Sequence, residues 1–366
     1  MNLYLHVPFC ARRCSYCDFS IAVRRQVPSE RFADSVLREW RGAQSLAAWN
    51  DDAELDTIYL GGGTPSHLDP AALGAILGGI RASRRVRPEA EITLEANPDD
   101  VTPAAAEAWR AAGIGRISLG VQSFSPGVLE WMHRTHTPEQ ARAAVRILRA
   151  AGFADLSLDL IYGLPAGIAR SWADDLEAAF ALEPEHLSCY GLTVEAHTPL
   201  GRWTASGRAA PVDERQYAEE FLQLCGALAS RGWDHYEVSN AARPGRRARH
   251  NSGYWEKASY LGLGPSAHSA VGGERWWNIR EYAAWDDAIQ RGADPVAGRE
   301  RLDEAQQRLE SLYLGLRTTT GAPVGLIPAD VRARWGQAGW AAESDGYLRL
   351  SAEGWLRLDA LVAEAA

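Results

Sequence analysis

The segment that decides the fold reads YLHVPFCARRCSYCDF and covers residues 4–19. Its three cysteines, Cys10, Cys14 and Cys17, have the spacing C-x-x-x-C-x-x-C. Thiolates select zinc, copper(I) or iron–sulfur centres. A structural zinc site normally closes with four protein ligands, often in C-x-x-C pairs, and this sequence has no partner pair. Three thiolates on a [4Fe-4S] cluster leave one iron free to chelate a small molecule through amino and carboxylate groups, so the spacing favours a cluster over zinc.

The composition limits the classes of function. The chain has 366 residues, 46% of them hydrophobic, and a formal net charge of −9, whereas nucleic-acid binders usually carry a basic surface. No apolar run approaches the roughly 18 residues of a membrane span, and no secretory signal is evident. Five cysteines, three of them in a metal-ligand spacing, suit a reducing compartment. We therefore expect a cytoplasmic protein with no nucleic-acid partner and no membrane span.

Short apolar segments alternate with helical segments up to residue 192, which predicts parallel βαβ units. The resulting α/β fold is either a doubly wound sheet or a partial (β/α)6 barrel, and both place their chemistry at the carboxyl ends of the strands. The expected strands cover residues 3–7, 57–60, 91–95, 116–121, 156–162 and 186–192. The expected helices cover residues 29–44, 70–84, 103–112, 125–132, 138–151 and 171–182.

The pattern changes after residue 192. A long helix is expected over 211–231, followed by a strand at 236–238 and an aromatic, glycine-rich segment at 249–269. The last part predicts a short helix near Asp330, a strand at 347–350 and a terminal helix, which is typical of a winged-helix-like α+β module. We therefore divide the chain into a barrel domain, residues 1–232, and a smaller C-terminal domain, residues 233–366.

Polar and glycine residues stand where the expected strands end. Gly61-Gly62-Gly63 ends the second strand and permits close approach of a ligand, because glycine has no side chain. Glu95, Gln122 and Asp159 interrupt or end later strands, and Arg134 could bind a carboxylate through its two-pronged guanidinium group. Each also has an ordinary alternative as a helix cap or loop ion pair. Their grouping at one end of the sheet favours a ligand site.

The cysteine spacing resembles the signature of the radical SAM superfamily, whose cluster binds and cleaves S-adenosylmethionine (SAM). The motifs GGGTP, LEANP, GVQS, DLIYGLP and GLGPSA follow it in order. Together they are similar to the oxygen-independent coproporphyrinogen III oxidase family and its relative, the radical SAM heme chaperone HemW. This resemblance implies the partial barrel, with Cys10, Cys14 and Cys17 as the ligands of a [4Fe-4S] cluster. It also implies SAM contacts at Tyr4, Tyr16, Gly62, Gly63, Thr64, Glu95, Gln122, Arg134, Asp159 and Thr193.

Three features separate the oxidase from the chaperone. The oxidases have a further cysteine two residues after the third ligand, where this chain has Phe19, and an extension before the first strand, which here begins almost at Met1. Apart from these three features, the oxidases have a smaller residue where this chain has Thr193, one of the implied SAM contacts. Residues 250–255, HNSGYW, resemble the H-N-x-x-Y-W element of HemW. The resemblance therefore implies the chaperone branch.

The same element implies a heme site at His250, Tyr254 and Trp255. A histidine can ligate heme iron, and aromatic rings can pack against a porphyrin face. His268 is a second candidate ligand. The alternative is that His250 is a buried histidine whose hydrogen bonds are satisfied within the fold.

Three functions are compatible with these residues. The first is a heme chaperone that binds heme, a [4Fe-4S] cluster and SAM, and passes heme to an acceptor protein. The second is an oxygen-independent coproporphyrinogen III oxidase, in which a SAM-derived radical removes hydrogen from propionate side chains. The third is a plain electron carrier, which would need no SAM pocket. The first is favoured, with a heme-accepting protein and a low-potential electron donor as expected partners; whether the protein turns over SAM stays open.

Overall fold

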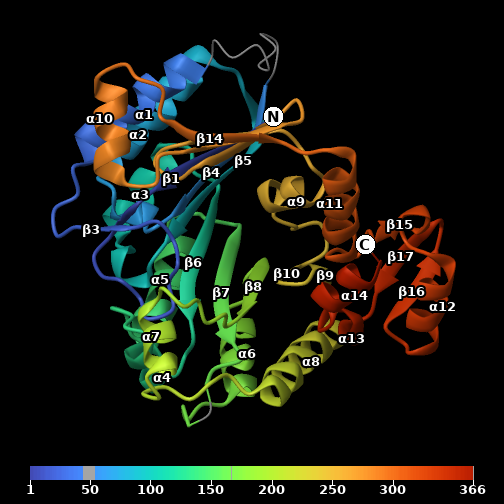
Figure 1. Ribbon diagram of the computed structural model, residues 1–366. Coiled ribbons are helices and arrows are strands. Elements are labelled where there is room, and N and C mark those ends of the chain that lie inside the picture. Colours follow the sequence, from blue (N-terminus) through green and yellow to red (C-terminus); the bar gives the residue numbers. More distant parts are fainter. Residues whose placement is uncertain (44–53, 166, 366) are drawn as a thin grey trace.

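The computed structural model describes residues 1–43, 54–165 and 167–365. Six parallel strands form the partial barrel that the sequence predicts, and they neighbour one another in chain order (Figure 1). Because all six run in the same direction, their carboxyl ends meet at one mouth. The strands are β1 (Asn2–Val7), β4 (Leu55–Gly62), β5 (Val86–Ala96), β6 (Arg116–Gln122), β7 (Leu156–Tyr162) and β8 (His186–Gly191).

Helices cover the outer face of these strands, and side chains cap most of them at their first residues. Asp69, Thr102, Thr137 and Ser171 each accept a hydrogen bond from a backbone N–H of the helix that follows, which satisfies donors that a helix leaves unpaired. The expected end of the first helix at Gln44 lies outside the described residues. The helices are α1 (Ser29–Ala43), α2 (Pro70–Ser83), α3 (Pro103–Ala111), α4 (Pro126–Trp131), α5 (Pro138–Ala150) and α6 (Trp172–Phe180).

The sheet continues at both edges with strands from the second half of the chain. After α8 (Glu214–Ser230), β9 (Asp234–Glu237) and β10 (Asn240–Ala242) add antiparallel to β8. At the other edge β11 (Tyr260–Leu263) pairs parallel with β1. The 12-stranded sheet therefore does not end at residue 232, and the division at 232/233 stays a prediction about domains.

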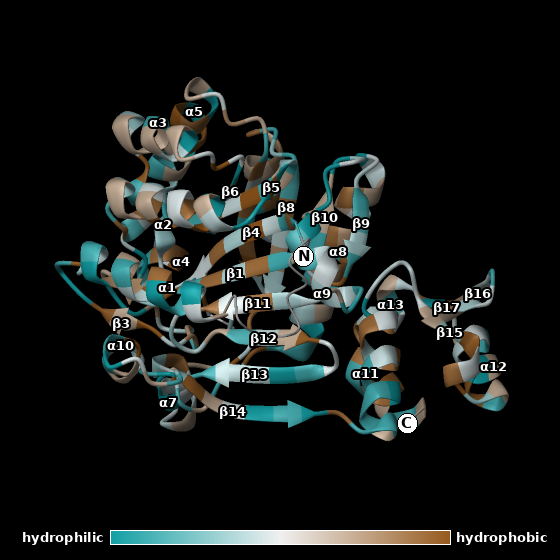
Figure 2. Ribbon diagram, turned by 90° about the horizontal axis from the view of Figure 1, so that it is seen from above, coloured by the Kyte–Doolittle hydropathy of each residue, from teal (hydrophilic) through white to brown (hydrophobic). Residues whose placement is uncertain are grey.

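Three antiparallel strands follow β11, namely β12 (His268–Val271), β13 (Glu274–Asn278) and β14 (Val296–Arg301). Figure 2 shows β13 and β14 in hydrophilic colours, whereas β1 and β11 carry hydrophobic stretches. Most side chains of β14 are exposed, as expected for an edge strand.

The C-terminal module has the element order of a winged helix, as the sequence predicts. Its antiparallel sheet has the order β15-β17-β16, and its core contains the fully buried Trp335. None of the helices in the described residues combines the length and apolarity needed to cross a bilayer. The module consists of α11 (Glu304–Leu316), β15 (Ala322–Pro323), α12 (Ala329–Gln337), β16 (Ala341–Ser344), β17 (Tyr347–Leu350), α13 (Ala352–Trp355) and α14 (Leu358–Ala365).

The turn after β11 allows a test of the pairing between β1 and β11, which joins the two halves of the chain. Gly264 has φ +93°, and a Cβ there would lie 2.4 Å from the carbonyl oxygen of His6. Gly264→Ala should lower the free energy of unfolding by about 1–3 kcal/mol, because it adds both strain and a clash. Gly78→Ala is the matched control: it lies within α2, has open space around it, and should stabilise by about 0.5–1 kcal/mol. Urea unfolding measures both, and equal stabilities of Gly264→Ala and wild type would contradict the prediction.

Candidate functional site

A cavity of about 450 Å³ opens at the carboxyl ends of the barrel strands. All three cysteines of the first loop line it, so the fold brings the candidate cluster ligands and the strand ends together. Tyr4 does not line it: the Tyr4 hydroxyl lies 3.1 Å from His6 Nδ1, and its ring stacks on Tyr59. The other positions implied as SAM contacts do line the cavity, namely Tyr16, Gly62, Gly63, Thr64, Glu95, Gln122, Arg134, Asp159 and Thr193.

The glycines after β4 make room for the cysteine loop itself. A Cβ at Gly63 would lie 2.8 Å from the carbonyl oxygens of Pro8 and Phe9, and the Gly63 N–H donates to the carbonyl of Val7 at 2.7 Å. Gly62 has φ +113°, and a Cβ there would lie 2.6 Å from the His6 ring. The run therefore lets the start of the cysteine loop pack against the end of β4, besides leaving the cavity wall free of side chains.

The three thiols are free, and two of them accept hydrogen bonds. Thr64 Oγ1 donates to Cys10 Sγ at 3.4 Å, and Arg134 Nη1 donates to Cys14 Sγ at 3.5 Å. Burial raises the pKa of Cys10 to about 11 and that of Cys17 to about 12. The thiols of Cys10 and Cys17 are therefore protonated without a cation, and loading of a metal centre would release their protons.

The arrangement fits a cluster better than a single zinc ion. Among the described residues, no three His, Cys, Asp or Glu side chains are gathered so that they could hold one metal ion. Ligands of one zinc all lie about 2.3 Å from the same atom, whereas cysteines of a [4Fe-4S] cluster each bind a different iron and stand farther apart. With donors already aimed at two sulfurs, Cys10, Cys14 and Cys17 suit the cluster.

Asn97 joins the two hydrogen bonds to sulfur, and this role was missed from the sequence. Its Oδ1 accepts from Arg134 Nη2 at 2.6 Å, and its Nδ2 donates to Thr64 Oγ1 at 3.3 Å. A continuous hydrogen-bonded chain thus runs from Cys10 through Thr64, Asn97 and Arg134 to Cys14. The position of Asn97, two residues after Glu95 at the end of the same strand, is the signal that could have indicated it.

Glu95 is a half-buried carboxyl group that faces the cavity. Its two oxygens accept hydrogen bonds from the Tyr59 hydroxyl at 2.8 Å and the Gly62 N–H at 3.0 Å. Burial raises the pKa of Glu95 to about 7, although the bond from Tyr59 opposes the shift. Glu95 can therefore accept from a ligand hydroxyl or amine near neutral pH.

Gln122 and Asp159 complete the polar wall. Gln122 has φ +68°, and the β6–β7 register shifts between Leu119 and Gln122; such irregularities re-aim side chains beside functional sites. Asp159 accepts from Ser118 Oγ at 3.0 Å, and burial raises its pKa.

His250 lies outside this cavity, on α9 (Arg249–Trp255), and is 1% exposed. The single hydroxyl proton of Thr57 is donated to Asn2 Oδ1, so Thr57 Oγ1 accepts the hydrogen bond from His250 Nδ1 at 2.6 Å. Because Nδ1 carries the ring proton, His250 Nε2 accepts from the Tyr254 hydroxyl at 2.9 Å. Burial and the nearby Arg116 lower the pKa of His250 to about 3. Both ring nitrogens are occupied, which is the arrangement of a satisfied histidine, and heme ligation here stays a prediction that requires the Tyr254 hydroxyl to leave Nε2.

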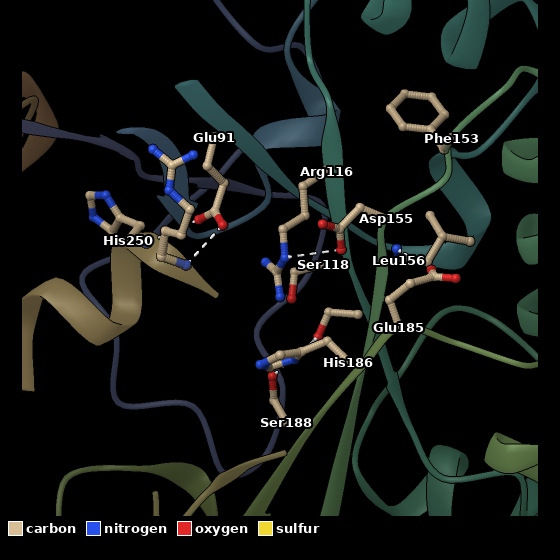
Figure 3. Close-up of polar contacts among 12 residues, drawn as sticks. Glu91, Arg116, Ser118, Phe153, Asp155, Leu156, Glu185, His186, Ser188 and His250 are labelled. Atoms are coloured by element: carbon tan, nitrogen blue, oxygen red, sulfur yellow. Dashed lines mark hydrogen bonds and ion pairs between the residues drawn. The ribbon is translucent and has the colours of Figure 1, made fainter. Parts of the chain in front are cut away.

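The surroundings of His250 are polar (Figure 3). Glu91 Oε1 accepts from the His250 backbone N–H at 3.0 Å, which fixes the first turn of α9 to β5. Arg116 lies nearby, 3.6 Å from Asp155. Helix α9 is thus held against the amino-terminal parts of the barrel strands, away from the mouth at their carboxyl ends.

The other implied heme residues lie at separate places. The Trp255 ring faces the Arg317 guanidinium at 4.5 Å. His268 is exposed and stacks on Trp277. The structure therefore does not gather His250 and His268 around one space.

Comparisons with known proteins agree with this geometry. A family model described as the radical SAM superfamily matches residues 4–177. The heme chaperone HemW of Mycobacterium tuberculosis is 38% identical over 334 residues, which is 91% of this chain and 85% of that protein. HemW of Escherichia coli is 37% identical over 272 residues, 74% of this chain and 70% of that protein.

A solved structure is similar over nearly the whole chain. Coproporphyrinogen III oxidase (HemN) from Escherichia coli, a radical SAM enzyme, superposes with a TM-score of 0.84 at 22% identity, over 99% of this chain and 89% of that one. Fold and cysteine loop together define a radical SAM protein. The chain belongs to the HemW family of this superfamily.

The hydrogen-bonded chain through Asn97 predicts a change in the cluster's reduction potential. Asn97→Ala should lower the potential, because hydrogen bonds to cluster sulfurs raise it and the variant releases both Thr64 and Arg134. If the reduced cluster loses about 1 kcal/mol of hydrogen-bond stabilisation, the potential falls by roughly 40 mV for one electron. Anaerobic redox titration of the reconstituted protein measures the shift.

Ser66→Ala is the control for Asn97→Ala. Ser66 Oγ accepts from the Asn97 backbone N–H at 3.2 Å but makes no hydrogen bond to the cysteines, all of which lie in the described part of the chain, so its removal should leave the potential unchanged. Equal potentials for Asn97→Ala and wild type, with full iron and sulfide content, would contradict the role of Asn97.

Proposed function

We propose that this protein is a heme chaperone, which binds heme, a [4Fe-4S] cluster and SAM and transfers heme to an acceptor protein. The observation that carries the proposal is the single cavity that three free cysteines share with polar strand-end residues, in a chain of the HemW family. A plain electron carrier would not need this polar wall.

The residues of the cavity have separable roles in this proposal. Cys10, Cys14 and Cys17 hold the cluster, which when bound supplies a low-potential electron and an iron that chelates SAM. Glu95 and Asp159 accept hydrogen bonds from the amine or hydroxyl groups of SAM. The backbone at Gly62 and Gly63 allows the ligand to approach closely.

Arg134 acts on the cluster loop as well as on the ligand. Its guanidinium donates to Cys14 Sγ, to Asn97 and, at 2.7 Å, to the carbonyl of Gly120. Its buried Nε has no hydrogen-bond partner among the described residues, so a donor remains there that a carboxylate can use.

Heme ligation by His250 would require one hydrogen bond to break. With Nδ1 donating to Thr57, the Nε2 lone pair is the one that could bind iron, and the Tyr254 hydroxyl occupies it. The hydroxyl therefore competes with iron for this nitrogen. We infer that release of Tyr254 is the step that opens the site.

Two variants of this element should have opposite effects on heme affinity. Tyr254→Phe keeps the ring but frees Nε2, so it should tighten heme binding about fivefold for the roughly 1 kcal/mol no longer needed to break the bond. His250→Ala should weaken binding about tenfold or more, since iron loses its ligand. Absorbance titration with hemin measures both; unchanged affinity in His250→Ala would remove the ligand assignment.

The expected partners follow from this role. A heme acceptor is implied, and a low-potential electron donor is needed to reduce the cluster. All five cysteines are free, which supports a reducing compartment, and we propose the cytoplasm.

The cluster assignment has a direct test. Cys14→Ala should remove most of the iron and sulfide and the broad absorbance near about 400 nm, because two thiolates cannot hold the cluster. Cys225→Ala is the control, since Cys225 lies on α8 and does not line the cavity. Full iron and sulfide content in Cys14→Ala would overturn the assignment.

A further inference from the structure

The cysteine loop and the segment after it carry a concentration of positive charge. Arg12, Arg13, Arg24 and Arg25 are all exposed, and residues 11–25 contain a single acidic side chain, Asp18. The whole chain, by contrast, has a formal net charge of −9.

Within residues 1–43, 54–165 and 167–365, none of these four arginines forms an ion pair. Many other arginines of this part of the chain do. Arg13 and Arg24 donate only to backbone carbonyls, of Cys17 and Val23. Their charge is therefore free to act on a partner.

Apolar side chains lie between the arginines. Phe19 is 59% exposed and Val23 is 44% exposed, two of the few large hydrophobic side chains left open to solvent. Val23 belongs to a small two-stranded sheet of β2 (Phe9–Cys10) and β3 (Ala22–Val23), and Phe19 precedes β3 in the chain. We call Arg12, Arg13, Arg24 and Arg25, together with Phe19 and Val23, the basic face. Apolar centres with charged rims are typical of protein interfaces.

The basic face is built on the loop that carries the candidate cluster ligands. Cys14 and Cys17 are half-buried in this loop, and Cys10 pairs directly with Val23 in the two-stranded sheet. Figure 1 shows the segment around β3 (blue) at the outer edge of the molecule. A partner seated there would lie against the ligand loop itself.

We propose that the basic face is the docking site for the electron donor, a small acidic protein that carries a low-potential one-electron group. One electron passes from the reduced donor to the oxidised cluster, which goes from the 2+ to the 1+ state, and the donor is oxidised by one electron. Opposite charges steer such an encounter and speed it. The inference rests on the cluster of the proposed function.

Nearby acidic groups leave this charge balance intact. Asp18 lies within the segment, and Glu281 follows Arg280, whose side chain donates to the Asp18 carbonyl at 3.4 Å. Arg280 and Glu281 offset each other. Arg12 and Phe19 also line the candidate cavity, which Asp99, Asp100 and Glu195 share, so the excess of positive charge on the outer side of the basic face rests on Arg13, Arg24 and Arg25.

The test is the rate of cluster reduction by an acidic donor. Reduced flavodoxin serves as the probe in anaerobic stopped-flow measurements on the full, reconstituted chain. The double variant Arg24→Glu/Arg25→Glu should lower the second-order rate constant about tenfold or more at low ionic strength. The difference should shrink as salt rises, because surface charges are screened.

Two controls separate docking from damage. The double variant Arg146→Glu/Arg301→Glu makes the same change in net charge on exposed arginines of α5 and β14 and should keep the wild-type rate. Reduced methyl viologen, a small cation, should reduce the Arg24/Arg25 variant at least as fast as wild type. A loss with methyl viologen as large as that with flavodoxin would place the defect in the cluster and overturn the proposal.

The remaining outcomes also decide. Equal rates of reduction by flavodoxin in wild type and in the Arg24/Arg25 variant would overturn the proposal. A loss of heme affinity in that variant with an unchanged reduction rate would also overturn it, because heme would then be the occupant of the basic face. Failure of the proposed function looks different: a protein that holds its cluster and is reduced through the basic face, yet binds no heme, would contradict the chaperone and leave the docking site standing.

Discussion

The guanidinium of Arg134 connects the cysteine loop to the barrel. It donates to Cys14 Sγ in the loop, to Asn97 after β5 and to the Gly120 carbonyl in β6, so one half-buried cation fixes three segments that are far apart in sequence. The backbone of Ser15 adds two further ties, to Met132 and Leu200. Because the loop is short and has little secondary structure, its position over the mouth depends on these bonds.

Close backbone packing is the second constraint. The Gly63 N–H bonds the Val7 carbonyl, and Gly264 lies against the His6 carbonyl, so both neighbours of β1 hold the strand end from which the loop leaves. Side chains at either glycine would push the loop away from the wall that carries Glu95. The site and the fold therefore depend on the same glycines.

The features that could be predicted from the sequence are those that hydrophobic periodicity and position at a strand end determine. The six strands and the residues at their carboxyl ends follow from local pattern and from the parallel geometry, whereas their order in a partial barrel was implied by the family resemblance. Strand β11 escaped prediction because Gly262 and Gly264 make its segment look like a loop, although Gly262 is needed where a Cβ would lie 2.1 Å from the His268 carbonyl. Asn97 was missed because its partners come from two other segments.

His250 shows the limit of inference from a motif. The residue type suits heme iron, but Thr57, Asn2 and Tyr254, which decide whether its nitrogens are free, come from other strands or another turn of the helix. No local pattern encodes such a hydrogen-bond chain. Likewise, only the fold reveals that neither Arg24 nor Arg25 forms an ion pair with any of the described residues.

One anaerobic assay tests the central claim, that this radical SAM protein is a chaperone and not an oxidase. The reconstituted protein is incubated with SAM, a reductant and coproporphyrinogen III, and protoporphyrinogen is quantified by chromatography, with SAM binding and cleavage as internal controls. The account predicts no protoporphyrinogen from a protein that holds its cluster, binds SAM and takes up heme. Protoporphyrinogen formed over many turnovers would contradict it.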